Sequence, residues 1–225
     1  MQKMVMSEQG TVENLRLQEL ARPSPQAHEI LVRIAAAGVN PVDAKQRGRG
    51  TVTGGRAPAI LGCDGAGIVE AVGESVTRWQ PGDAVYYCHG GVGGMRGNYA
   101  EYICIPEVVA ARKPQMLDFP QAAAAPLVLL TAWEALHDRA RLEPGQKVLI
   151  HAGAGGVGHV AIQLAKQAGA DVCTTVSTPE KARFVERLGA DKIVFYQETA
   201  WVEQVKGWSH GGVGLVFDTV GGATL

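Results

Sequence analysis

One short stretch constrains the fold of this chain more than any other: HAGAGGVGHVAIQLAKQAG, residues 151–169. It carries glycines at positions 153, 155, 156 and 158, and the apolar run KVLIH leads into them. Apolar residues then recur at positions 157, 160, 161, 164, 165 and 168, which is the spacing of one helical face. The stretch therefore predicts a buried strand over residues 147–151, a glycine-rich turn and an amphipathic helix.

The alternation of strand and helix continues to the end of the sequence. We expect strands over residues 171–176, 192–196 and 214–220, with helices over 177–189 and around 200–208. The first of these helices opens on STPE, which offers a hydroxyl cap, a proline in the first turn and an acid near the positive helix end. Strands that alternate with helices form parallel sheets through right-handed crossovers. Four strands of a doubly wound α/β sheet are therefore predicted; a complete dinucleotide fold has six, so its second half is expected to be largely absent.

The sequence changes character near residue 120. Before it, short runs of β-forming residues such as 29–36 and 68–72 are separated by turn signals, among them Arg22-Pro23 and Pro81-Gly82-Asp83. This pattern favours a compact, mostly β module. Residues 119–137 are apolar and predicted to be helical, bridging into the strand at 147–151.

Composition excludes several classes of protein. The net charge is −1 and the pI about 6.6, so no basic face for nucleic acid is expected. We expect no signal peptide, and the apolar run at residues 122–133 is too short to span a bilayer and is interrupted by Pro126. The four cysteines show no paired spacing, which is typical of reduced thiols. A cytoplasmic location is therefore predicted.

The glycines match G-x-G-x-x-G between a predicted strand and a predicted helix, which favours dinucleotide binding over a turn without ligand. Gly153 allows the tight turn, Gly155 lets the backbone approach a pyrophosphate, and Gly158 lets the helix pack on the strand. Gly156 and Val157 complete the loop, and the helix N-terminus attracts the anion. His151 and His159, which flank the loop, are interpreted as structural.

The expected dinucleotide is NADPH. An NAD site usually has Asp or Glu about 20 residues after the loop, to bind the ribose 2′-hydroxyl. Here the second strand ends in VSTPEK, and no acid stands at its tip. Ser177 and Lys181 suit a 2′-phosphate instead. The alternative is ordinary helix capping by Ser177 or Thr178 beside a solvated Lys181.

Several motifs resemble those of the medium-chain dehydrogenase/reductase superfamily, in particular its zinc-independent quinone oxidoreductase branch. Besides the glycine loop they are GVNPVD (38–43), GCDGAGIVEAVG (62–73), PGD (81–83), NYAEY (98–102) and LTAW (130–133). The resemblance implies a GroES-like catalytic domain over residues 1–120, incomplete, and an NAD(P)-binding Rossmann domain over 121–225. It also implies an active site in the cleft beside the nucleotide domain, and a chain truncated at its C-terminus.

The resemblance also bears on zinc. Zinc-dependent members carry a Cys where this chain has Asn40, a His where it has Cys63, and a further Cys near Leu127. A catalytic zinc needs three N, S or carboxylate ligands, which this set does not supply. No metal is therefore expected.

The same resemblance implies roles for individual residues. Asn40 and Thr131 line the nicotinamide, and Lys45 joins them as a candidate donor to the developing oxyanion. Asp43 and Asp64 are expected to brace loops. The residues implied to bind the cofactor are Gly153, Gly155, Gly156, Val157, Gly158, Ser177, Lys181, Tyr196 and Thr219. Alternative interpretations are a turn residue for Asn40, a strand-end aromatic for Tyr196 and a hydroxyl bonded within its helix for Thr131.

The implied reaction is hydride transfer from NADPH to a small-molecule quinone or α,β-unsaturated carbonyl. The alternatives are a zinc-dependent alcohol dehydrogenase, or a truncated cofactor-binding or regulatory protein without activity. Homo-oligomers are common in the superfamily, but the edge strand that usually pairs across the dimer is expected to be missing here.

Overall fold

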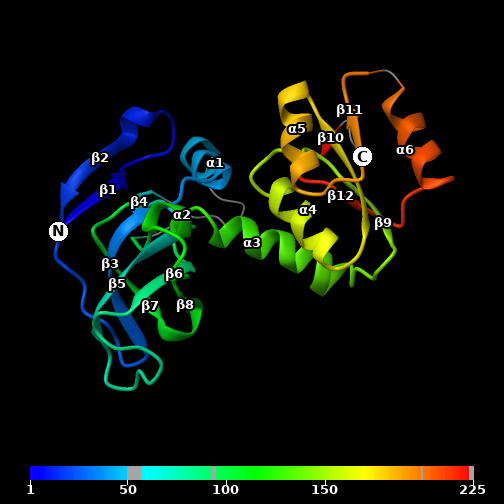
Figure 1. The fold of residues 1–225 in the computed structure, drawn as a ribbon. Coiled ribbons are helices and arrows are strands. Elements are labelled where there is room, and N and C mark those ends of the chain that lie inside the picture. The colour runs from blue at the N-terminus through cyan, green and yellow to red at the C-terminus, as the bar shows by residue number, and fades with distance from the viewer. Residues whose placement is uncertain (50–56, 93–94, 199, 223–225) are drawn as a thin grey trace. The chain divides into compact units, whose positions relative to one another are not determined.

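The structure is a computed structural model and describes residues 1–49, 57–92, 95–198 and 200–222. The chain divides into two compact units, Met1–Leu127 and Val128–Leu225 (Figure 1). The division falls inside helix α3 (Pro126–Trp133). Within the described ranges, no helix combines the length and the apolar character needed to cross a membrane.

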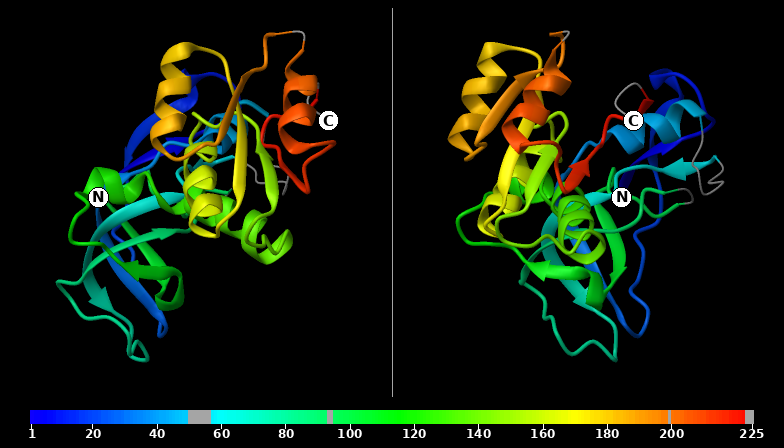
Figure 2. Two further views of the ribbon diagram at one scale, coloured as in Figure 1. Left: turned by 45° about the vertical axis from the view of Figure 1, so that its right-hand side comes forward. Right: turned by 90° about the vertical axis from the view of Figure 1, so that its right-hand side faces the viewer.

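The first unit contains two antiparallel sheets. The larger has the order β7 (Tyr102–Pro106), β3 (Glu29–Ala37), β5 (Asp64–Val72), β6 (Ala84–Cys88) and β8 (Ala110–Arg112). The smaller has the order β2 (Leu15–Glu19), β1 (Gln2–Met6) and β4 (Ala59–Ile60). The long strands β3 and β5 run side by side through this unit (Figure 2). The predicted turn at Pro81-Gly82-Asp83 joins β5 to β6, and Gly82 takes a φ of +97° there.

Both faces of the larger sheet are covered. One carries a hydrophobic core that includes Ile30, Val32 and Val85. On the other, helix α2 (Phe119–Ala123) packs its alanines against Ala66 of β5. Short 3-10 turns, η1 (Val12–Asn14) and η2 (Glu107–Val109), complete the mostly β module that the sequence predicts.

Helix α1 (Pro41–Arg49) is an α-helix of this unit that the sequence analysis did not predict. Its N-terminus is stabilised by Asp43, whose carboxylate accepts the backbone N–H of Asn40 at 2.8 Å. Asn40 stands before a proline and three residues before this acid, which is a helix-start pattern. The pattern N-P-x-D could therefore have revealed the helix.

Residues 119–137 are helical over most of their length, as predicted, but they do not form a single helix. Three segments occupy this stretch: α2, α3 and the π-helical η3 (Glu134–Arg139). Asp118 and Gln121 form a reciprocal capping box at the start of α2. The break precedes Pro126, because proline has no N–H and its ring disfavours helical geometry in the residue before it.

The second unit is a four-stranded parallel sheet with the order β11 (Lys192–Phe195), β10 (Asp171–Val176), β9 (Lys147–Ile150) and β12 (Leu215–Phe217). The helices between the strands are α4 (Gly158–Gln167), α5 (Pro179–Arg187) and α6 (Trp201–Ser209). The predicted α/β class, a GroES-like β-rich module followed by part of a Rossmann sheet, is confirmed.

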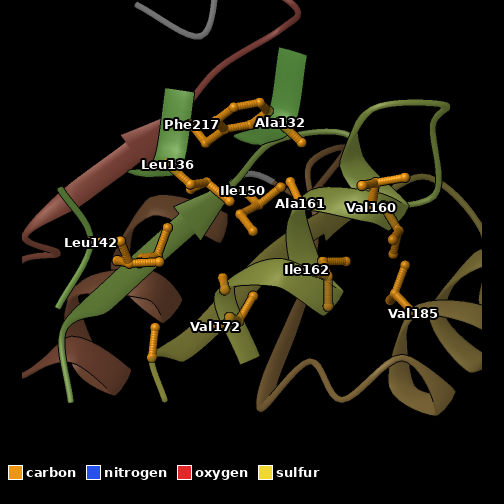
Figure 3. Packing of buried hydrophobic residues seen from close by; sticks show 14 residues of the cluster. Ala132, Leu136, Leu142, Ile150, Val160, Ala161, Ile162, Val172, Val185 and Phe217 are labelled. Carbon is orange, nitrogen blue, oxygen red and sulfur yellow. The ribbon is translucent and has the colours of Figure 1, made fainter. Parts of the chain in front are cut away.

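The strands of this sheet bury side chains on both faces, as parallel strands do. Ile150 and Val172 face the core shared with α4 and α5 (Figure 3), and Val148 belongs to the same cluster. Leu149 and Cys173, the alternate residues, pack with α6. Helices α4 and α5 accordingly lie on one side of the sheet and α6 on the other (Figure 1).

Candidate cofactor and active-site residues

The glycine-rich loop leaves β9 and enters α4 through two positions where no side chain fits. A Cβ on Gly153 would overlap the hydroxyl of Thr174, and a Cβ on Gly158 would overlap the carbonyl oxygen of Ala152. Gly155 and Gly156 are exposed, and a Cβ on Gly156 would find only Val128 Cγ1, at 3.6 Å. The first and last glycines therefore serve packing, whereas the two between leave the backbone open to a ligand.

A pocket of about 160 Å³ lies beside this loop. Its lining residues are Ala152, Ala154, Gly155, Thr175, Val176, Ser177, Lys181 and Tyr196. The sheet register explains why Ser177 and Tyr196 lie close together in this pocket. Val176 of β10 pairs with Phe195 of β11, so the residue that follows each of them leaves the sheet at the same edge. Carboxyl ends of parallel strands are where α/β sheets bind ligands.

The polar side chains that line this pocket are hydroxyl groups and one ammonium group, that of Lys181. Lys181 Nζ donates to Ser177 Oγ at 3.0 Å. The cap of α5 is Thr178, whose hydroxyl accepts the backbone N–H of Lys181 at 3.3 Å. Ser177 is therefore not the N-cap residue of α5, and its hydroxyl lies in the pocket beside the ammonium of Lys181. All the residues that line the pocket within the described part of the chain are neutral or basic.

The other predicted cofactor residues lie outside that pocket lining. Val157 immediately precedes α4 as its N-cap residue. Thr219 is exposed beyond the end of β12. His151 directly follows β9 and is 2% exposed, in agreement with a structural role, and burial lowers the pKa of its imidazole. His159 Nδ1 lies 3.0 Å from the carbonyl oxygen of Gly155.

In the first unit, Asn40 is held between two buried carboxylates. Its side-chain N–H donates to Asp64 Oδ2 at 2.9 Å, and its backbone N–H donates to Asp43. The other oxygen of Asp64 accepts the N–H of Leu127 at 2.9 Å. Asn40 itself is 8% exposed. The amide of Asn40 is therefore fixed in one orientation, with its nitrogen committed to Asp64.

Asp43 and Asp64 act as braces, as the sequence analysis expects. Asp43 also accepts the Gly62 N–H at 3.2 Å and the Tyr99 hydroxyl at 3.0 Å. Burial raises the pKa of Asp64, and hydrogen bonds from Asn40, Cys88 and Leu127 partly oppose that rise. Burial, with the nearby carboxylates, also raises the thiol pKa of Cys63 to about 11 and that of Cys88 to about 12. Both thiols are therefore protonated at neutral pH.

The remaining two candidate catalytic residues are exposed. Lys45 lies on α1, whose residues Asp43 and Gln46 are buried. Thr131 lies on α3 in the second unit. The meeting of Thr131 with Asn40 and Lys45 thus stays a prediction.

Known proteins resemble both units. The family model of the alcohol dehydrogenase GroES-like domain matches residues 26–115, and that of zinc-binding dehydrogenases matches residues 156–225. An alcohol dehydrogenase superfamily protein from Novosphingobium aromaticivorans has a crystal structure with a TM-score of 0.92 and 41% identity. That match covers all of this chain and 67% of the other. The chain therefore belongs to the alcohol dehydrogenase superfamily, the medium-chain dehydrogenases/reductases, in the group that includes quinone oxidoreductases.

Within that group, the Escherichia coli quinone oxidoreductase complexed with NADPH is 34% identical, with a TM-score of 0.89, and the match covers all of this chain and 68% of that one. Human quinone oxidoreductase is 31% identical over 218 residues, which are 96% of this chain and 65% of the human protein. A zinc-type alcohol dehydrogenase-like protein of Staphylococcus aureus (strain COL) is 38% identical over 81% of this chain. The chain spans 55% of that relative's length.

The residues at the implied zinc positions do not fit a zinc ion. The amide nitrogen of Asn40 is bonded to Asp64, and Leu127 offers only main-chain atoms. Over the residues that the structure describes, no three or more His, Cys, Asp or Glu side chains are arranged to hold a metal. These positions therefore lack the set of ligands that a catalytic zinc needs.

Proposed function

We propose that this chain provides the cofactor-binding loop and the substrate-side β module of an NADPH-dependent oxidoreductase that reduces a quinone or an α,β-unsaturated carbonyl. The observation that carries the proposal is the pocket beside Gly155, where Ser177, Lys181 and Tyr196 meet. An ammonium and a hydroxyl suit a 2′-phosphate, whereas the acid typical of NAD sites has no counterpart among the lining residues. The E. coli quinone oxidoreductase complexed with NADPH, a structural neighbour, agrees with this choice.

In this proposed function, the glycine loop binds the cofactor, and Asn40, Lys45 and Thr131 act on the nicotinamide and the substrate. When bound, NADPH supplies a hydride from C4 of its nicotinamide. The loop at residues 153–158 receives the pyrophosphate, with the N-terminus of α4 adding partial positive charge. Asn40, oriented by Asp64, positions the nicotinamide and substrate. Lys45 and Thr131 donate hydrogen bonds to the oxygen on which negative charge develops.

The cofactor half of the proposal is tested with Lys181→Ala. We expect NADPH affinity to fall roughly 10- to 100-fold, because a charge-assisted contact is worth about 1.5–3 kcal/mol, and NADH affinity to stay unchanged. Fluorescence titration with both nucleotides measures this. Lys206→Ala is the matched control, since Lys206 lies on α6 and pairs with Glu203. Equal affinity of the parent chain for NADPH and NADH would refute the 2′-phosphate assignment.

The catalytic half is tested with Asn40→Ala. We expect turnover to fall about 10-fold or more while NADPH affinity changes less than threefold, because Asn40 acts at the reacting end of the cofactor. Steady-state NADPH oxidation with a panel of quinones and enones gives both quantities. An unchanged rate removes Asn40 from the site. A parent chain that binds NADPH but reduces no member of the panel is a binding protein instead.

A further inference from the structure

Ala152, the residue before the first glycine of the loop, has an unusual backbone. Its φ is +52°, in the left-handed region that L-residues with a side chain rarely adopt. Alanine has no polar side chain to compensate locally, as Asn or Asp can. Ala152 also lines the pocket formed by Ser177, Lys181 and Tyr196. An unfavourable conformation at a ligand-facing position must be held by its surroundings.

The polar groups of Ala152 show what holds it. Its carbonyl oxygen accepts the N–H of Gly155 at 2.8 Å, and its own N–H donates to Thr175 Oγ1 at 3.0 Å. The next N–H along the loop, that of Gly153, donates to the carbonyl oxygen of Thr175 at 3.1 Å. One residue of β10 therefore binds two consecutive N–H groups of the loop, the first through its side chain and the second through its main chain.

His151 gives the Thr175 hydroxyl a second partner. Its Nδ1 lies 3.3 Å from Thr175 Oγ1, and its ring meets that of Trp201 edge to face at 5.6 Å. A hydroxyl has one hydrogen and two lone pairs. Neutral His151 with its proton on Nε2 accepts that hydrogen, which leaves a lone pair facing Ala152. Burial lowers the pKa of His151, although Asp218 acts in the opposite direction, so the neutral form fits this arrangement.

We infer that Thr175 is a positioning residue for the cofactor, whose hydroxyl holds Ala152 in the left-handed conformation that presents the glycine loop to the pyrophosphate. This inference rests on the proposed function of the loop as the NADPH site. The competing interpretation is that Thr175, which is 2% exposed, is a core residue with a satisfied hydroxyl. The two differ in one respect: only a positioning role makes the effect of losing the hydroxyl depend on the residue at position 152.

The test is a double-mutant cycle between these two positions. Thr175→Val keeps the shape and removes the hydroxyl, and we expect it to weaken NADPH binding about 10-fold. Thr175→Ser restores most of the affinity. Ala152→Gly adopts positive φ freely and is the reference for the second half of the cycle, whatever its own NADPH affinity. In the Ala152→Gly background, Thr175→Val should lower NADPH affinity by less than about threefold, because the conformation no longer needs the hydroxyl.

Thr174→Val is the matched control. The Thr174 hydroxyl donates to the carbonyl oxygen of Ile150 at 2.7 Å, inside the sheet, so Ala152→Gly should not rescue this variant. Fluorescence titration gives NADPH affinity, and thermal unfolding identifies variants that have merely lost stability. If Thr175→Val does not fold, Thr175→Cys, with its weaker acceptor, gives the same comparison.

Amide exchange of the nucleotide-free chain separates this inference from the proposed function. We expect Thr175→Val to speed exchange at Ala152 and Gly153 more than elsewhere in the second unit. A parent chain that does not bind NADPH refutes the proposed function, and the exchange result still decides whether Thr175 holds the loop. Unchanged exchange at both amides, or an NADPH affinity of Thr175→Val within twofold of the parent, overturns the inference. So does a loss of NADPH affinity from Thr175→Val that is as large in the Ala152→Gly background as in the parent.

Discussion

A Gly153→Ala variant is expected to lose about 3 kcal/mol or more of unfolding free energy and, with it, NADPH binding. The added Cβ would overlap Thr174 Oγ1 and approach Ile162 Cδ1 to 2.9 Å. Neither neighbour can retreat easily, because both are fully buried and the Thr174 hydroxyl is bonded to Ile150. The cost therefore comes from overpacking at the point where the loop crosses β10.

Gly156→Ala is the matched control for this prediction. A Cβ at position 156 meets only Val128 Cγ1, at an ordinary contact distance of 3.6 Å. We expect its melting temperature to stay within about 2 °C of the parent, since no buried contact changes. Differential scanning calorimetry compares the two. A Gly153→Ala variant as stable as Gly156→Ala would show that the loop is not packed against Thr174.

The second large effect is expected in the first unit, for Asp43→Ala. This carboxylate is 3% exposed and accepts four hydrogen bonds: from the N–H groups of Asn40 and Gly62, from the Tyr99 hydroxyl and from the Cys63 thiol. Its removal leaves these donors without their acceptor and uncaps the start of α1. Because each buried unpaired group costs about 1–3 kcal/mol, we expect a loss of about 3 kcal/mol or more.

Urea unfolding followed by circular dichroism measures this loss. Tyr99→Phe is the graded control, because it deletes one of the four donors and keeps the carboxylate, and a loss of about 1 kcal/mol is expected. Similar losses for Asp43→Ala and Tyr99→Phe would contradict the role of Asp43 as a shared acceptor. Asn40 shifts with Asp43 in this interpretation, so turnover should fall in Asp43→Ala even where the protein is still folded.

The second unit was the more predictable half of the chain. Its helices and strands follow local signals, such as the cap at Thr178 before Pro179 and the apolar periodicity of α4. In the first unit, the N-P-x-D pattern at residues 40–43 is a local signal of the same kind, and it marks the start of α1. The stretch at residues 119–137 is helical as predicted, and it divides before Pro126, the residue that interrupts its apolar run.

The sequence by itself determined the periodicity of the elements, the glycine positions and the absence of an acid after the second strand of the nucleotide unit, because these are set within a few residues. Only the tertiary structure decided which side chains meet. Strand register brings Tyr196 beside Ser177, and Asp43 binds Tyr99 from 56 residues away. The hydrogen bond from the Ala152 N–H to the Thr175 hydroxyl likewise joins the ends of two neighbouring strands, from residues that lie 23 positions apart in the sequence. Such contacts depend on how strands pair and on which buried donors need acceptors. Neither can be predicted from the spacing of residues within one element.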